Sequence, residues 1–173
     1  MKIVKKPKKG EYPPYAAIYL DQVPDDGNLI DHLGKGKALI NKLYSDQNEK
    51  VLMFRYEPDK WTMKDILAHI IDDERVFAYR ALRFARNDKT ELPGVDQDVD
   101  AENTGANDRN ISDLLDEYNK VRDSSIALFK SFNEEMIVRC GIASGYNVSV
   151  SALGYLIAGH ERHHLKIIKE RYL

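Results

Sequence analysis

The sequence predicts an all-α protein folded as a four-helix bundle, and three observations carry this prediction. Four long segments place apolar residues three or four positions apart, the spacing that fills one face of a helix. No series of segments shows the two-residue alternation of strands. The connection at residues 88–109 is long enough to cross the fold, so the second and third helices can run parallel.

The first helix is expected from about Asn28 to Ser45, after a turn at residues 24–27. Its apolar positions repeat with the helical period at Leu29, Leu33, Ile40 and Leu43.

The second helix is expected to start near Trp61 and to end near Arg86. Thr62 and Asp65 have the spacing of a capping box, with Asp in place of the usual Glu or Gln. Its narrow apolar face consists of Ile66, Ile70, Phe77, Ala81 and Phe84.

The polar residues of this second helix are the ones that bear on function. Three of them lie along one edge of the apolar face, roughly one turn apart in a series that consists of His69, Asp73, Val76 and Arg80. Glu74 projects within the apolar face, which is unusual for a carboxylate. We expect an ion pair with an arginine of another helix there, rather than catalysis.

The third helix is expected from about Ser112 to Phe132. A loop at residues 139–148 then precedes a last helix, which Ser149 or Ser151 caps and which continues to the end of the sequence. Gly154 and Gly159 lower the stability of that helix, and close approach of a neighbouring helix or a ligand would account for them.

Composition excludes several functional classes. With 173 residues, 43% of them hydrophobic, the chain suits one soluble domain, and its net charge of −2 gives no field that favours nucleic acid. No apolar run approaches the roughly 18 residues that span a membrane. A single cysteine, Cys140, excludes an internal disulfide and fits the cytoplasm. We expect the lysine-rich residues 1–11 to be a flexible, solvated tail.

Two histidines interrupt the apolar stripe of the last helix. His160 and His164 occupy steps of the stripe where its apolar residues are missing, and residues four apart share one helical face. Paired helical histidines of this kind bind transition metals. With Glu161 the segment also matches the H-E-x-x-H motif of zinc proteases, in which the Glu is the general base. The match could be accidental, because glutamate is frequent on helix surfaces. His163 could pair with His160 instead, but it lies beside the stripe, so we place it next to the site or at the surface.

A metal site needs a third ligand, and His69 is the best candidate. It is the only histidine on the edge of another helix's buried face. Three neutral imidazoles suit Zn, Ni, Fe or Co. Asp73 could orient one of these ligands or bind the ion directly. A hydrogen-bonded histidine cluster without metal is the alternative at this point.

Two motifs together resemble the DinB-like superfamily. They are Trp61-Thr62 followed by His69-x-x-Asp72-x-Glu74-x5-Arg80, and Gly159-His160-Glu161-x-His163-His164. The resemblance implies an up-down-down-up four-helix bundle and a divalent metal held by His69, His160 and His164. Characterised relatives include thiol-dependent S-transferases and isomerases, and some members are described as metal-dependent hydrolases. A homodimer is common in such families.

The function hypotheses follow from this resemblance. The first is an enzyme acting on a small molecule, in which the metal activates a low-molecular-weight thiol or a water molecule. Arg80 could receive a carboxylate of the thiol or substrate, or form a structural ion pair. The second is a non-catalytic bundle that binds a metal or ligand. We expect no nucleic-acid partner and no membrane association.

Overall fold

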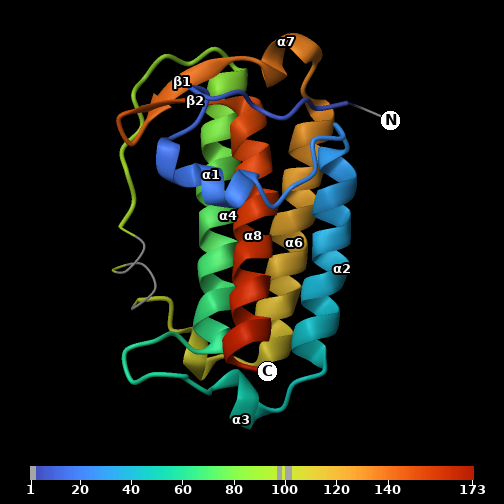
Figure 1. Ribbon diagram of the computed structural model, residues 1–173, viewed down its shortest axis with the longest axis vertical. Coiled ribbons are helices and arrows are strands. Elements are labelled where there is room, and N and C mark those ends of the chain that lie inside the picture. The colour runs from blue at the N-terminus through green and yellow to red at the C-terminus, as the bar shows by residue number, and fades with distance from the viewer. Residues whose placement is uncertain (1–2, 97–98, 100–102) are drawn as a thin grey trace.

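Four long helices lie side by side and form the body of the molecule (Figure 1). In the computed structural model, which describes residues 3–96, 99 and 103–173, they are α2 (Leu29–Ser45), α4 (Met63–Ala85), α6 (Ile111–Ser131) and α8 (Val150–Arg171). The predicted bundle is confirmed, with helix ends close to the expected ones. Both predicted caps are present: Thr62 and Asp65 form a reciprocal capping box, and the Ser149 side chain accepts a hydrogen bond from the Ala152 N–H.

The helices follow the expected order of directions. In Figure 1, α2 and α8 run downward, whereas α4 and α6 run upward and are parallel to each other. Each helix packs on two of the others, in the pairs α4–α8, α4–α6, α2–α6 and α2–α8. The chain therefore returns from the top of α4 to the bottom of α6, which explains the long polar connection.

Short elements close the two ends of the bundle. At the lower end in Figure 1 lies α3 (Glu49–Leu52), and η2 (Ala106–Asp108) packs on α4. At the upper end lie α7 (Glu134–Ile137) and a hairpin. The segments η1 (Pro14–Ala16) and α1 (Ala17–Leu20) cross the side of the bundle, where α1 packs on α8.

The hairpin differs from the sequence-based expectation of a loop at residues 139–148. Strands β1 (Cys140–Ala143) and β2 (Tyr146–Ser149) pair antiparallel, with Ala143 opposite Tyr146. Ser144 and Gly145 form a two-residue turn in which both residues have positive φ, 53° and 77°. Strands of four residues are too short to show an alternating pattern in the sequence.

The flexible tail expected for residues 1–11 is not seen at residues 3–11, whereas residues 1 and 2 lie outside the described part of the chain. Val4 is fully buried, its N–H donates to the Gly27 carbonyl at 2.9 Å, and its carbonyl accepts from the Tyr155 hydroxyl at 2.9 Å. The Lys6 ammonium donates to the Val23 carbonyl at 2.9 Å. An apolar residue among the lysines thus anchors this segment on α8.

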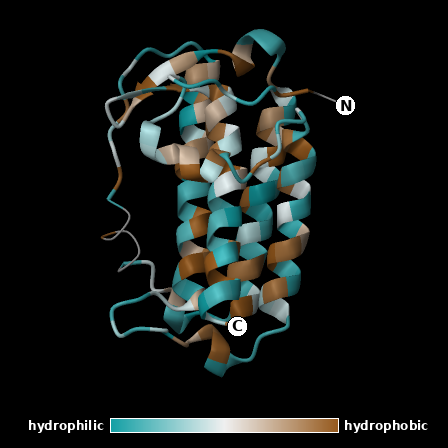
Figure 2. Ribbon diagram, viewed as in Figure 1, coloured by the Kyte–Doolittle hydropathy of each residue, from teal (hydrophilic) through white to brown (hydrophobic). Residues whose placement is uncertain are grey.

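The apolar core has two clusters along the bundle. One includes Leu20, Phe84, Phe129 and Tyr155, and the other includes Tyr44, Leu67, Leu114 and Ile168. Figure 2 shows hydrophobic and hydrophilic residues interleaved along all four helices, as expected when one face of each is exposed. Among the described residues, no helix is long and apolar enough to cross a membrane.

Candidate metal centre

Three histidine side chains meet inside the bundle. His69 comes from α4, and His160 and His164 come from successive turns of α8. The Nε2 atom of His160 lies 3.0 Å from that of His69 and 3.0 Å from that of His164. All three residues are buried, with exposed fractions of 4%, 5% and 8%. The structure thus brings together all three predicted ligands; that they hold a metal stays a prediction.

Burial keeps these imidazoles neutral. It lowers the pKa of His69 to about 4 and that of His164 to about 3, the latter with help from the neighbouring histidines. Burial likewise lowers the pKa of His160 well below its ordinary value, and His164 and His69 add to this shift. Neutral imidazole nitrogens are the form that binds a metal.

The nitrogen geometry fits a shared cation. His160 Nε2 faces two other Nε2 atoms, but a neutral ring nitrogen offers either one proton or one lone pair. It can therefore satisfy only one of the two contacts by an ordinary hydrogen bond. A cation bound at about 2.0–2.1 Å by three tetrahedral imidazoles would place their nitrogens about 3.3 Å apart, close to the 3.0 Å of the two contacts that His160 makes, and all three ligand atoms lie within 4.8 Å of one another. The donor set therefore fits a divalent transition metal.

The metal-free protein is expected to lose stability as the pH falls from 7 to 5. The folded-state pKa of His69, about 4, lies below the ordinary value of 6.5, so the unfolded chain binds protons in this range and the folded chain does not. The stabilisation that neutral His69 contributes is complete above about pH 6.5 and is lost as the pH falls toward 4. The loss at pH 5 is on the order of 2 kcal/mol in the free energy of unfolding.

Urea denaturation at the two pH values measures this loss. A His69→Gln variant, which has no imidazole to titrate at this position, should lose less stability than the wild type between pH 7 and pH 5. Equal losses in the two proteins would contradict the assignment.

Asp73 lies beside the histidines, as predicted for a residue one turn after His69. Its Oδ2 atom is 3.5 Å from His160 Nε2 and 3.8 Å from His69 Nε2, and its side chain is 17% exposed. A carboxylate in this place can accept a proton or a hydrogen bond from a molecule held at the three nitrogens.

Glu161, the acidic residue of the H-E-x-x-H match, points away from the histidines. Its Oε2 atom accepts hydrogen bonds from Arg122 Nη2 and from the Tyr118 hydroxyl, both at 2.6 Å. The residue is 1% exposed, and burial raises its pKa, which Arg122 and Tyr118 only partly offset. The match to a zinc protease motif is therefore accidental in function, because this carboxylate does not face the site.

Arg122 also explains the buried Glu74. Its Nε and Nη2 atoms donate to the two carboxylate oxygens of Glu74 at 2.9 and 2.8 Å, which confirms the expected ion pair with an arginine of another helix. Arg122 Nη1 donates to the Leu33 carbonyl at 2.9 Å, and the residue is fully buried. One guanidinium thus joins two carboxylates in the centre of the bundle.

His163 lies next to the cluster without joining it. Its Nδ1 atom is 3.5 Å from the Gln22 amide nitrogen, and its ring contacts Tyr19 edge to face with centroids 5.2 Å apart. Trp61 packs on the His69 ring with centroids 4.8 Å apart. These aromatic side chains hold the histidine rings in place.

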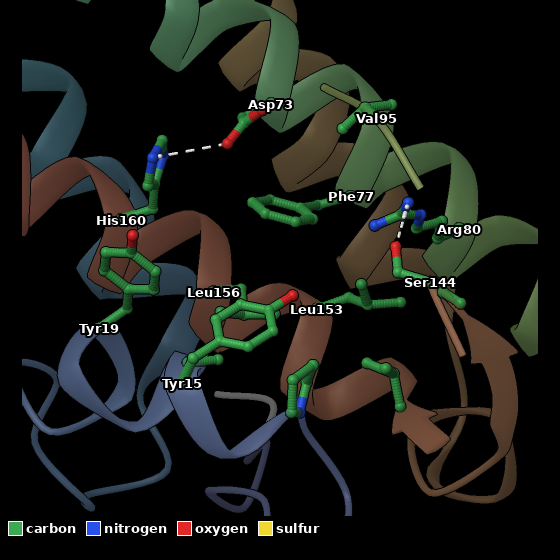
Figure 3. A pocket seen from close by; sticks show the side chains of 14 residues that line it. Tyr15, Tyr19, Asp73, Phe77, Arg80, Val95, Ser144, Leu153, Leu156 and His160 are labelled. Atoms are coloured by element: carbon green, nitrogen blue, oxygen red, sulfur yellow. Dashed lines mark hydrogen bonds and ion pairs between the residues drawn. The ribbon is translucent and has the colours of Figure 1, made fainter. Parts of the chain in front are cut away.

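A cavity of about 340 Å³ extends from the histidine cluster along α4 (Figure 3). His160 and Asp73 lie at one end, and Arg80 and Ser144 lie at the other. Its walls combine apolar and aromatic side chains with polar groups, and the former include Tyr15, Tyr19, Phe77, Leu153 and Leu156. Tyr15 is 61% exposed, so a small molecule can reach the cavity from solvent.

Gly159 lets the segment that carries Tyr19 lie against α8. A Cβ atom at this position would be 2.2 Å from the Tyr19 carbonyl oxygen and 2.6 Å from its carbon. Gly159→Ala is therefore expected to displace this segment and to lower the free energy of unfolding by about 1–3 kcal/mol, measured by urea denaturation.

Gly34→Ala is the matched control for this substitution. Gly34 also lies within a long helix, α2, but no atom lies within 4 Å of the added Cβ. The free energy of unfolding of this variant should rise by up to about 1 kcal/mol, because alanine favours the helical conformation more than glycine does. A Gly159→Ala variant as stable as the wild type would show that the close approach does not constrain the segment.

Sequence reasoning missed three polar residues of the cavity, Tyr15, Tyr19 and Ser144. The two tyrosines lie in a segment that reads as a rigid aromatic stretch, and only Gly159 signals that something approaches α8 closely. Ser144 carries no signal of its own, because its place depends on how the hairpin packs against α4.

Comparisons with known proteins agree with this architecture. The DinB superfamily matches residues 32–168, which is most of the chain. Among solved structures, YfiT from Bacillus subtilis is similar with a TM-score of 0.74 and 17% sequence identity, covering 94% of this chain and 92% of that one. That protein is described as a probable metal-dependent hydrolase with an unusual four-helix bundle topology. At this identity the likeness shows the fold alone. No curated protein matches the chain.

Proposed function

The chain belongs to the DinB superfamily, and on that premise we propose that it is a metal-dependent enzyme that acts on a small molecule, with His69, His160 and His164 as metal ligands. The observation that carries the proposal is the convergence of three neutral imidazole nitrogens around His160, which lines one end of a solvent-accessible cavity. Three protein ligands leave coordination positions for a reactant, as in catalytic metal sites.

Each part of the site has a role in this proposal. A divalent transition metal such as Zn, Ni or Fe, when bound, supplies Lewis acidity and lowers the pKa of a coordinated thiol or water. The three histidines supply neutral nitrogens at pH 7 because burial lowers the pKa of each. Asp73 accepts the proton of the nucleophile. Tyr19 and Phe77 exclude bulk water from that end of the cavity.

The proposed reaction is displacement by a low-molecular-weight thiol: its sulfur forms a bond to a carbon of a small electrophile, the bond from that carbon to the leaving group breaks, and the thiol proton passes to Asp73. The apolar and aromatic side chains in the cavity wall, such as Phe77 and Leu156, suit a soft thiolate and a carbon electrophile, and the family resemblance also supports a thiol. Hydrolysis is the second candidate, which the position of Asp73 beside His160 favours, since a carboxylate there can serve as general base toward water.

A turnover assay separates the two reactions. Protein loaded with Zn or Ni is given 1-chloro-2,4-dinitrobenzene with bacillithiol, glutathione or no thiol, and separately 4-nitrophenyl acetate without thiol. Transfer that requires a thiol and is lost in His164→Ala supports the transferase. Thiol-independent ester cleavage that is lost in the same variant supports the hydrolase. Activity that survives in His164→Ala, or no activity with any electrophile or ester, counts against the enzyme proposal.

A metal-binding bundle without catalysis is the remaining alternative. It predicts that Asp73 closes the coordination sphere, so that Asp73→Asn weakens metal binding as strongly as loss of a histidine. An enzyme with an open position predicts nearly unchanged metal content and reduced turnover in that variant. The homodimer and the cytoplasmic location expected from the sequence stay predictions.

A further inference from the structure

We propose that the end of the cavity opposite the histidines binds a carboxylate, with Arg80 as the cationic partner and the Ser144 hydroxyl as a second donor. The substrate class of the enzyme is then a small molecule whose carboxylate is several atoms away from its reacting group. The substrate assignment rests on the proposed function, whereas the anion site itself rests only on the residues around Arg80.

Arg80 is a buried cation without a carboxylate partner. It is 8% exposed, and its Nη2 atom donates to the Pro93 carbonyl at 2.8 Å and to Ser144 Oγ at 3.2 Å. Among the described residues it forms no ion pair, in contrast to Arg122, which joins two carboxylates. Burial lowers the pKa of Arg80, and Tyr15 and Asp73 only partly offset this. A buried charge without compensation is costly, so an anionic ligand would relieve the cost.

The unused donors of Arg80 face the cavity. A guanidinium has five N–H donors, and both hydrogen bonds found within the described chain come from Nη2. The Nε and Nη1 donors therefore remain for a ligand. Figure 3 shows the guanidinium directed toward Ser144 and the cavity interior, beside Phe77. Both bidentate forks of a guanidinium include Nη2, which is occupied here, so a carboxylate would accept one charge-assisted hydrogen bond from Arg80 and a second hydrogen bond from Ser144.

Ser144 supplies the second donor. Its Oγ atom accepts the hydrogen bond from Arg80, so its own hydroxyl proton remains to be donated to a ligand. The residue occupies the left-handed region, with φ of 53°, at a turn position that usually takes Asn, Asp or Gly. A serine there strains the backbone, and its hydroxyl lies where the cavity ends.

The cavity sets the length of the ligand. Asp73 and Arg80 are seven residues apart on α4, about 10 Å along the helix axis. Phe77, Leu153 and Leu156 line the space between the two ends. A molecule that reaches both ends has an apolar chain of about six atoms between its carboxylate and its reacting group.

The charge of this end favours a carboxylate over a phosphate. Apart from Arg80 and the neutral His160, the described lining residues include no basic side chain. One guanidinium balances one negative charge, which matches a carboxylate, whereas a phosphate dianion would retain an uncompensated charge.

The test compares two ligands that differ only at the end placed against Arg80. Binding of 6-mercaptohexanoate and of 6-mercaptohexan-1-ol to the zinc-loaded protein is measured by calorimetry. We expect the acid to bind at least about tenfold more tightly, since hydrogen bonds to charged groups are the strong ones. In Arg80→Gln the ratio of the two affinities should fall to about one, and the zinc content should stay unchanged.

Arg83→Gln is the matched control, because Arg83 lies on the same helix but pairs with Asp88 outside the cavity. It should keep the full preference of the wild type. Arg80→Lys and Ser144→Ala give second variants if Arg80→Gln fails to fold, and both should reduce the preference without abolishing it. Equal binding of acid and alcohol to the wild type, or a preference that survives in Arg80→Gln, would overturn the proposal.

Two further measurements distinguish failure of the Arg80 anion site from failure of the proposed metal-dependent function. Hexanoate and hexan-1-ol, which lack the thiol, are titrated into the metal-free protein, so a preference for the acid there supports the Arg80 site even if no metal binds. Competition with inorganic phosphate and acetate tests the anion class. Stronger displacement by phosphate than by acetate would overturn the assignment to a carboxylate.

Discussion

His164→Ala is expected to abolish stoichiometric metal binding. The three buried imidazole nitrogens lie 3.0 Å apart in two contacts that share His160, and loss of one leaves too few ligands for a stable site. Loss of a residue that merely supports a ligand costs 10–100-fold in affinity, so loss of a ligand should cost more than about a hundredfold. Metal analysis of the purified variant measures this directly.

His163→Ala is the matched control, because it removes a histidine adjacent in sequence that contacts the His164 ring from outside but whose Nδ1 faces Gln22 and not the cluster. Its metal content should equal that of the wild type. If His164→Ala keeps its metal, or if the two variants lose metal equally, the ligand assignment fails.

Arg122→Met is expected to have the largest effect on stability. The fully buried guanidinium joins Glu74 and Glu161, so its removal leaves two carboxylates buried without a cation. Breaking a buried ion pair in this way costs about 3–5 kcal/mol. Because a domain of this kind has about 5–15 kcal/mol of stability in total, the variant should be largely unfolded at moderate urea concentrations.

Two further variants make this prediction specific. Adding Glu74→Gln and Glu161→Gln to Arg122→Met removes the uncompensated charges and should recover part of the loss. Lys37→Met, which breaks an exposed pair with Asp123, should cost less than about 1 kcal/mol. Equal urea midpoints for Arg122→Met and Lys37→Met would show that the buried network does not hold the bundle together.

The helices were predictable because their signals are local and repeated. Each of the four has an apolar face over many turns, and the caps at Thr62 and Ser149 lie within three residues of the groups they bind. The hairpin at residues 140–149 has no such repeat. The packing of Val4 depends on a contact with Gly27 and Tyr155, which no local pattern reveals.

The candidate site was predictable only where its residues share a local sequence pattern. His160 and His164 share a helical face by spacing alone, and His69 follows from the orientation of one other helix. The partners of Glu161 were not predictable, because Arg122 and Tyr118 reach it from α6 across the bundle. Likewise Arg80 and Ser144 meet only because the hairpin folds over the end of α4.

The central claim is that His69, His160 and His164 hold one metal ion between them. X-ray absorption spectroscopy of the zinc-loaded protein tests it most directly. We expect about one ion per chain with three imidazole nitrogens at about 2.0–2.1 Å. A spectrum with no more than one imidazole around the ion, or one that stays the same in His69→Ala, would contradict the claim.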